Sequence, residues 1–310
     1  MMNTLLFATI VLIWGSAWIV IKFQLGVVAA EASVAYRIGI AALIMFVWAI
    51  IRRLPLRFSL HDHLFIALQG ALIFSTNFFL FYLAAGYLTT GLISVVLSTA
   101  AALTMLFNAL RLRRPPALRV IFGAVLGILG ISLIFWPEVA GFTLESGAAL
   151  GLLLSIGGTV CFSLGSIVSA RNQAAGISLR GSTAWAMFYG VVLLSVFVIL
   201  RGKSFTFDPR LPYVASLLYL SIFGSVIAFV SYFALLGRMD AGRAAYATVL
   251  FPIVALILST RFEGYQWTAA ALVGVLLTLV GNVFVLMQPR PVPRSRKNKA
   301  KAGHNEAQGL

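Results

Sequence analysis

Ten apolar runs fill this chain almost from end to end, and no other feature of the sequence constrains its fold as much. A helix needs about 20 apolar residues to cross a hydrocarbon layer about 30 Å thick, where every backbone amide must be bonded within the protein. Hydrophobic residues make up 61% of the chain and charged residues only 10%, far from the balance of a soluble domain. We therefore predict an all-α integral membrane protein with ten transmembrane helices, at roughly 3 to 23, 34 to 51, 64 to 85, 92 to 110, 118 to 135, 148 to 170, 182 to 200, 212 to 235, 243 to 260 and 267 to 287.

Basic residues are distributed unevenly between the predicted loops, and this predicts how the chain is oriented. If ten spans alternate in direction, 17 of the 23 Lys and Arg residues fall on the side that holds both termini. Loops rich in Lys and Arg stay in the cytoplasm, so we expect both termini to be cytoplasmic. The net charge of +15 is then a topology signal. We expect the basic tail 289–310 to be disordered and held near anionic lipid, without a nucleic-acid partner.

The chain also contains an internal repeat. Aligned with itself at an offset of 151 residues from Phe81 onward, it pairs several glycines, among them Gly86 with Gly237 and Gly130 with Gly281. Each half, 1–137 and 138–288, holds five spans, and this odd number makes the second half enter the membrane from the opposite side. We expect two inverted five-helix repeats around a central cavity, because secondary transporters of this architecture bind substrate near the midplane.

Small residues line one face of the fifth and tenth spans. This face consists of Gly123, Gly127 and Gly130 in the fifth span and of Gly274, Thr278 and Gly281 in the tenth. Such spacing lets two helix backbones approach closely, so we interpret the face as a packing seam. We expect Gly15 to permit the same close approach by the first span.

Hydroxyl and amide side chains within the spans are the first candidates for a solute pathway. Ser163 belongs to a hydroxyl face of the sixth span, Ser225 and Tyr232 share a face of the eighth, and Ser98 lies in the fourth. Asn77 has four hydrogen-bonding positions to satisfy in hydrocarbon, and it is therefore the polar residue that most favours a lined pathway. Hydroxyls in lipid also bond back to their own helix, so a purely structural role stays open for them.

Aromatic residues in the middle of spans are the second group of candidates. Trp14 and Trp18 are four residues apart and so lie on nearly one face of the first helix, with Lys22 a further turn along. An amphipathic ring can pack against a small solute and still offer a donor. Lys22 can bind a carboxylate or extend to the membrane surface, and both alternatives stay open. Four more aromatic residues join the predicted binding set: Tyr82, Trp185, Tyr189 and Tyr246.

Further motifs occur near the span ends. Arg37 lies just inside the second span, and we expect it to pair with Glu31 at the mouth, because an arginine at a span edge seldom stays unpaired. Pro252 is expected to interrupt the ninth helix, where its freed carbonyl suits a gating bend or a tolerated kink. Together with LIWGSAWIVIKF, Lys22 and Glu263, these motifs resemble the EamA-type family of the drug/metabolite transporter superfamily over nearly the whole chain.

The resemblance implies ten helices in inverted repeats in a bacterial-type inner membrane, and export of amino acids or related small metabolites. It also implies gating or structural roles for Lys22, Arg37, Pro252 and Glu263. The first half departs from the family pattern, since Ala101 stands where the proline would fall. The roles of Pro252 and Glu263 can therefore be structural only.

We predict a secondary transporter that works by alternating access and is no enzyme. All eight acidic residues fall in loops or at span ends, so we expect gradient-driven transport without obligate proton coupling. The exported solutes that the resemblance implies are amino acids, including aromatic or other small neutral ones. The alternatives are a broad-specificity drug/metabolite proton antiporter, a channel or an intramembrane enzyme. We expect small-molecule solutes and lipid as partners and no cofactor or metal; the oligomeric state stays open, a monomer included.

Overall fold

The computed structural model describes residues 2–113, 115–136, 147–236 and 247–286, with side chains over 4–113, 115–136, 147–232 and 250–286. Within these ranges the chain forms helices joined by turns and contains no strand. Eight apolar helical segments are long enough to cross a membrane, and Leu118–Ile134 and Leu250–Phe262 are shorter apolar helices. The predicted all-α membrane fold with ten spans is therefore confirmed.

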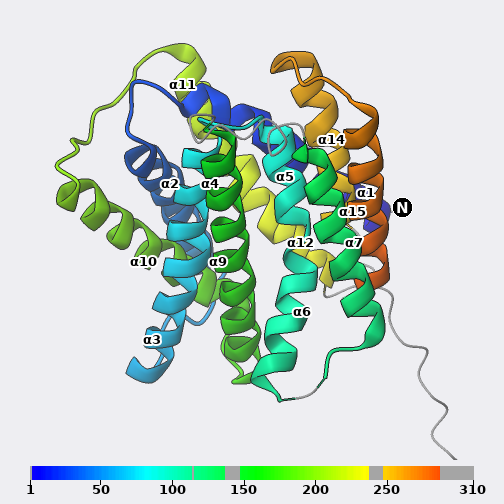
Figure 1. Ribbon diagram of the computed structural model, residues 1–310. Coiled ribbons are helices and arrows are strands. Elements are labelled where there is room, and N and C mark those ends of the chain that lie inside the picture. Colours follow the sequence, from blue (N-terminus) through cyan, green and yellow to red (C-terminus); the bar gives the residue numbers. More distant parts are fainter. Residues whose placement is uncertain (1, 114, 137–146, 237–246, 287–310) are drawn as a thin grey trace, which may run out of the picture.

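The helices follow each other in two sets of five spans (Figure 1). The first set consists of α1 (Met2–Ile21) with the 3₁₀ turn η1 (Lys22–Gln24), α2 (Ala30–Ile51), a third span of α3 (Leu60–Gln69), η2 (Gly70–Thr76) and α4 (Asn77–Ala84), a fourth span of α5 (Thr90–Ser98) and α6 (Ala100–Arg111), and α7 (Leu118–Ile134). The second set consists of α9 (Ala148–Ala174), α10 (Leu179–Leu200), an eighth span of α11 (Leu211–Tyr219), η3 (Leu220–Ile227) and α12 (Ala228–Leu236), α14 (Ala247–Phe262) and α15 (Ala269–Leu286). The predicted boundary between 137 and 138 lies outside the described residues.

The third and eighth spans each contain a π-helical segment at the same place in the repeat. η3 begins 150 residues after η2, close to the 151-residue offset of the sequence repeat. A π-helical turn holds an extra residue and shifts the backbone hydrogen bonds, and such turns are frequent at functional sites. Their equivalent positions agree with a duplicated architecture.

The two repeats are interlocked. α1 packs against α12 and α14 of the second repeat, while α9 packs against α4 and α6 of the first. α2 packs against α10, and α7 packs against α15, the pair of ribbons at the right of Figure 1. A two-fold axis between the repeats exchanges these partners, as inverted repeats require.

The small residues of α7 and α15 form the predicted packing seam. A Cβ on Gly123 would lie 2.5 Å from the carbonyl oxygen of Gly281, and one on Gly274 would lie 2.5 Å from that of Gly130. Only glycine permits such an approach, because these are backbone atoms that cannot turn aside. Gly15 also confirms its prediction, since a Cβ there would clash with α14.

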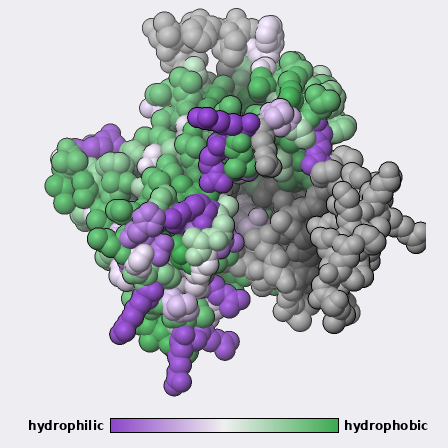
Figure 2. Space-filling view, turned by 90° about the horizontal axis from the view of Figure 1, so that it is seen from below, coloured by the Kyte–Doolittle hydropathy of each residue, from purple (hydrophilic) through white to green (hydrophobic). Residues whose placement is uncertain are grey.

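Basic side chains gather at one end of the helical bundle. The turns that join α2 to α3, α6 to α7, and α9 to α10, together with the helix ends beside them, carry six exposed arginines: Arg52, Arg53, Arg57, Arg111, Arg113 and Arg180. Figure 2 shows the molecule from below, with hydrophilic side chains clustered on this face next to hydrophobic ones. This asymmetry is the one that the sequence predicted for the cytoplasmic side, and the orientation in the membrane stays a prediction.

Candidate functional site

Arg37 is the buried charge of the candidate site. It is the eighth residue of α2, about 10 Å from the start of that helix, and only 3% of it is exposed. Its Nε donates to Ser225 Oγ of the second repeat at 3.3 Å, and its Cζ lies 4.4 Å from the centroid of the Phe78 ring. The predicted pair with Glu31 is wrong, and Glu31 binds Arg201 at 3.2 Å instead. Six residues along a helix turn a side chain to a different face, so Arg37 does not face Glu31, although Glu31 is the nearest acid in sequence.

The π-helical backbone of η3 explains why Ser225 accepts this hydrogen bond. Its Oγ donates to the carbonyl oxygen of Leu220, five residues earlier, at 2.9 Å. With the hydroxyl proton engaged there, the lone pairs are available to Arg37. Gly224 adds no side chain, and a Cβ there would lie 3.5 Å from Arg37 Nη2. The segment thus offers the guanidinium an acceptor and leaves space beside it.

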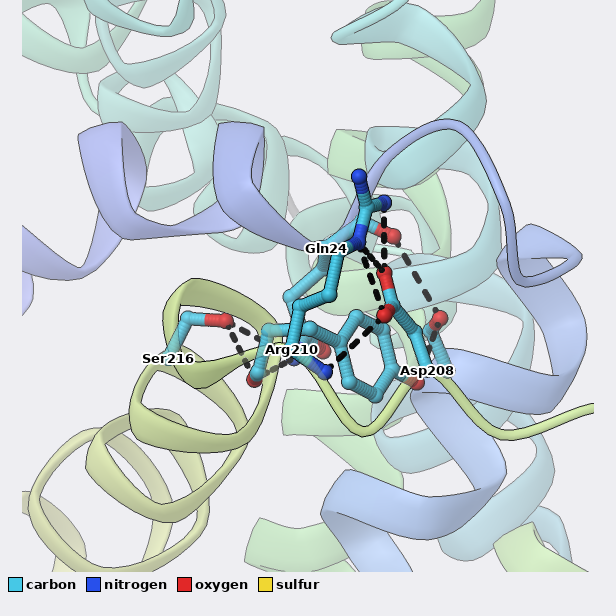
Figure 3. Close-up of polar contacts among 6 residues, drawn as sticks. Gln24, Asp208, Arg210 and Ser216 are labelled. Carbon is cyan, nitrogen blue, oxygen red and sulfur yellow. Dashed lines mark hydrogen bonds and ion pairs between the residues drawn. The ribbon is translucent and has the colours of Figure 1, made fainter.

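Gln24 connects the two repeats at the end of the first span, and it was missed by the sequence-based prediction. Its Nε2 donates to Ser216 Oγ at 3.1 Å and to the Tyr213 carbonyl oxygen at 3.3 Å, both on α11 (Figure 3). The Tyr82 hydroxyl donates to Gln24 Oε1 at 3.3 Å from α4. Gln24 is 1% exposed, so protein surrounds all these bonds. One signal pointed to it: Gln24 is the only amide side chain between the first two apolar runs.

These contacts join seven buried polar residues, which we call the Arg37–Gln24 network: Gln24, Ser33, Arg37, Tyr82, Tyr213, Ser216 and Ser225. Ser33 Oγ shares a hydrogen bond with the Tyr213 hydroxyl at 3.0 Å, and Arg37 interacts electrostatically with Tyr82. None of the seven is more than 4% exposed. The network links η1, α2 and α4 of the first repeat to α11 and η3 of the second. Secondary transporters place their substrate sites between repeats in this way.

A second polar cluster, the Lys22–Glu263 clamp, consists of Lys22, Ala85, Thr90 and Glu263. Lys22 Nζ donates to the Ala85 carbonyl oxygen at 2.8 Å and lies 3.4 Å from Glu263 Oε1. Glu263 Oε2 accepts hydrogen bonds from the Thr90 backbone N–H at 2.9 Å and from its hydroxyl at 2.7 Å. Of the two alternatives for Lys22, the structure therefore shows the carboxylate partner. Lys22 and Glu263 also line an open pocket of about 660 Å³.

An ion pair fixes the loop that leads into α11. Arg210 donates from Nε and Nη2 to the Asp208 carboxylate over distances of 2.7 to 2.9 Å (Figure 3). Its backbone N–H donates to the same carboxylate at 3.0 Å. These bonds hold the pKa of Asp208 below its usual value, and the carboxylate raises the pKa of Arg210. The pair thereby anchors the start of the helix that carries Tyr213 and Ser216.

The tryptophans of α1 share a face, as predicted. Both Trp14 and Trp18 lie 6.5 Å from the Phe251 ring of α14, between ring centroids. Trp14 also lies 5.5 Å from Tyr232, and Trp18 lies 5.3 Å from Phe81. The structure thus brings three predicted residues into one aromatic cluster between the repeats. Their part in solute binding stays a prediction.

Trp185 and Tyr189 form a second aromatic cluster, near the opposite end of the bundle. Their rings stack with centroids 5.9 Å apart, and Trp185 Nε1 donates to the Leu56 carbonyl oxygen at 3.0 Å. The Tyr189 hydroxyl and His63 Nδ1 share a hydrogen bond at 3.0 Å. Since His63 lies in the first turn of α3, these two residues are separate from the Arg37–Gln24 network.

Three further predicted residues are bonded into the helix packing. Asn77 Nδ2 donates to the Gly158 carbonyl oxygen at 2.8 Å, and Ser163 Oγ donates to the carbonyl four residues earlier at 2.8 Å. Ser98 Oγ accepts a hydrogen bond from Asn282 Nδ2 of α15 at 2.9 Å, and Asn282 is a second buried amide that the prediction missed. Each of the three predicted side chains is at most 2% exposed. Their role in a pathway stays a prediction.

The remaining two predicted residues, Pro252 and Tyr246, belong to the predicted ninth span. Pro252 lies inside α14, and the helix continues through it, so the predicted interruption is wrong. The fixed φ of proline fits a helix, and the carbonyl that it leaves free belongs to the first helical turn. Tyr246 lies outside the described residues.

Fold and site together define a polytopic α-helical membrane protein in which two inverted repeats meet through buried polar side chains. A model of the EamA-like transporter family matches residues 1–136 and again residues 149–287. The chain belongs to this family, and it is therefore a membrane transporter. The two matched segments agree with one family unit in each half.

Several relatives extend over most of the chain. The chain is 28% identical to the uncharacterized transporter YvbV of Bacillus subtilis (strain 168), over 89% of this chain and 88% of YvbV. It is 25% identical to the uncharacterized inner membrane transporter YedA of Escherichia coli (strain K12) over 91% of each chain, and 22% identical to protein PagO of Salmonella typhimurium over 96% and 97%. A solved protein described as "Crystal structure of protein" shares the fold, with a TM-score of 0.65 and 18% identity over 91% of this chain and 95% of that one.

Proposed function

We propose that this transporter exports amino acids, including aromatic or other small neutral ones, and related metabolites by alternating access. The observation that carries the proposal is the Arg37–Gln24 network, a set of buried polar groups between inverted repeats. The aromatic cluster around Trp14 and Trp18 adds the apolar surface that small-molecule sites combine with a few polar groups. The similarity to the inner membrane transporter YedA supports an inner-membrane location, and the arginine-rich end supports cytoplasmic termini.

We further propose that transport is driven by the solute gradient, without obligate proton coupling. Proton relays in membranes are usually carboxylates within the spans. Glu31 and Asp62 lie in the first turns of α2 and α3, Asp208 lies in a loop, and Glu263 follows the last residue of α14. A proton antiporter is the second candidate, and one observation favours it: the Glu263 side chain is only 6% exposed and lies between the repeats.

Exchange of labelled amino acids across reconstituted proteoliposomes tests both proposals. We expect saturable counterflow of the labelled solute. A channel would instead give conductance in a planar bilayer. Trp14→Ala and Asn77→Ala should slow the exchange, by up to about tenfold for the tryptophan, since an aromatic contact contributes about 0.5–1.5 kcal/mol. Trp136→Ala is the matched control, because this tryptophan is 60% exposed near a helix end. Failure of every amino acid to exchange contradicts the substrate class, and uphill uptake after a pH jump contradicts uncoupled transport.

A further inference from the structure

The Arg37–Gln24 network contains a cation without an anion. Arg37 is 3% exposed, and its Nη1 has no hydrogen-bond partner. The ion pairs of the described residues engage Lys22, Arg171, Arg201 and Arg210, and none of them engages Arg37. A charge buried at membrane depth is costly unless an opposite charge or well-placed dipoles compensate it. The structure therefore holds, between its two repeats, a buried guanidinium whose Nη1 makes no hydrogen bond.

The neighbours of Arg37 are neutral and small on one side. Ser225 and Phe78 contact the guanidinium through a hydrogen bond to Nε and through the ring face. A Cβ on Gly224 would lie 3.5 Å from Arg37 Nη2, 3.7 Å from Leu220 Cδ2 and 3.8 Å from the Cβ of Ala17, so Gly224 places no side chain beside Nη2. The Nε bond to Ser225 fixes the plane of the guanidinium and leaves its far edge for another acceptor.

The fold itself does not require a charge at this position. α2 and α10 are both 22 residues long and occupy equivalent places in the two repeats. Arg37 is the eighth residue of α2, and the eighth residue of α10 is Ala186, which is 0% exposed. Ser225 is the sixth residue of η3, and the sixth residue of η2 is Ser75, which is also a buried serine. The hydroxyl is therefore common to both repeats, whereas the cation of α2 is replaced by a methyl side chain in α10.

We infer that Arg37 is the anchor for a carboxylate of the transported solute, which its Nη1 binds between α2 and η3. The inference rests on the proposed function and narrows its substrates to carboxylates. A guanidinium matches the planar carboxylate with parallel N–H donors, and such charge-assisted bonds are stronger than neutral ones. Since Arg37 is closed off from solvent in this conformation, the solute reaches it when one end of the transporter opens.

Pairs of probes that differ only in the carboxylate test this inference on the full chain in lipid nanodiscs. Phenylalanine, methionine and threonine are each compared with their amides, and phenylpropionate provides a carboxylate without an ammonium group. Calorimetry should show that each acid that binds the parent does so about 10- to 100-fold more tightly than its amide, because the bond from Arg37 to the carboxylate is charge-assisted. Arg37→Met should bind acid and amide alike, and Arg37→Lys should retain part of the difference. The exposed Arg57 supplies the control variant, Arg57→Met, which should behave as the parent.

The stability of the ligand-free protein separates an anchor from a structural residue. Arg37→Met should unfold at the same temperature as the parent or a higher one, because an apolar side chain of similar volume replaces an unpaired buried charge. A clear fall in the unfolding temperature would assign Arg37 to the scaffold and overturn the inference. The acid and amide comparison on the parent needs no variant, so it decides even if Arg37→Met does not fold.

The binding results distinguish a failure of the inference from a failure of the proposed function. Three results would each overturn the inference. The parent could bind acids and amides equally, Arg37→Met could still bind acids more tightly than amides, or the parent could bind inorganic phosphate but none of the acids. A failure of every carboxylate to bind would overturn it as well. If the amino acids do not bind but phenylpropionate binds through Arg37, the inference holds and amino-acid export is wrong.

Discussion

Replacement of Glu263 by alanine should destabilise this transporter by about 2–4 kcal/mol. Glu263 Oε2 accepts two hydrogen bonds from Thr90, at 2.9 and 2.7 Å, and its side chain is 6% exposed. Hydrogen bonds to a charged group contribute about 1.5–3 kcal/mol each. Thr90 is the first residue of α5, where the helix itself offers its N–H no acceptor. Because two bonds to one oxygen are not additive, we expect less than their sum of about 3–6 kcal/mol.

Glu263→Gln separates these hydrogen bonds from the ion pair with Lys22. The amide keeps an oxygen acceptor for Thr90 but removes the negative charge that lies 3.4 Å from Lys22 Nζ. The Lys22 side chain is 36% exposed, so solvent screens the pair and we expect only about 0.5–1 kcal/mol from it. A double-mutant cycle with Lys22→Met should give a coupling energy of that size. Lys22→Met alone should cost more, since it also loses the 2.8 Å hydrogen bond to Ala85.

Two assays check this prediction. Unfolding can be followed with a thiol-reactive dye, because Cys161 is the only cysteine of the chain and is partly buried. Opening at the clamp end can be followed by labelling Thr89→Cys in the adjoining pocket, in a Cys161→Ala background. If the substitution destabilises only the closed state, each 1.4 kcal/mol of destabilisation raises the population of the open state about tenfold. The reasoning is refuted if Glu263→Ala unfolds and labels like the parent, or if Glu263→Gln is as harmful as alanine.

Two further predictions concern the seam and the loop before α11. Gly130→Val should destabilise the protein by about 3 kcal/mol or prevent folding, because its Cβ would meet the α15 backbone. Gly127→Ala should be tolerated, since its Cβ would make only a 3.5 Å contact. Thermal unfolding of both variants tests this prediction. Arg210 lowers the pKa of Asp208, so the pair should stabilise the protein fully above about pH 4 and lose this contribution as the pH falls through the lowered pKa. Denaturant titrations of the parent and Asp208→Asn should therefore converge in acid, and a pH-independent difference would contradict the assignment.

The spans and seams could be predicted from the sequence because they depend on local composition and helical period. An apolar run of sufficient length has one stable form in lipid, and glycines at helical spacing mark a face that another backbone can approach. Gly123 and Gly281 meet in this way across α7 and α15. Trp14 and Trp18 share Phe251 because four residues make about one helical turn.

The contacts between repeats could not be predicted, because they depend on which helices become neighbours. The nearest acid in sequence was assigned to Arg37, yet its partners are Ser225 and Phe78, on two other spans. The π-helical form of η3, which prepares Ser225 for that contact, has no signal in a single sequence. Gln24 was missed for a similar reason, since its importance follows from the helix α11 that covers it.

The two ends of the transporter are held together by contacts of different strength, and this difference fits export. At the η1 end, Glu31 and Glu263 are buried acids, each with a basic partner from the other repeat. At the opposite end, the ion pair between Arg171 and Asp62 is longer, at 3.8 Å, and about a quarter of each side chain is exposed. The Glu263 carboxylate also accepts two hydrogen bonds from Thr90 across the repeats, and we propose that the second end therefore requires less free energy to open. With the cytoplasmic termini that we propose, it faces the cytoplasm, and a solute bound for export would reach Arg37 from that side.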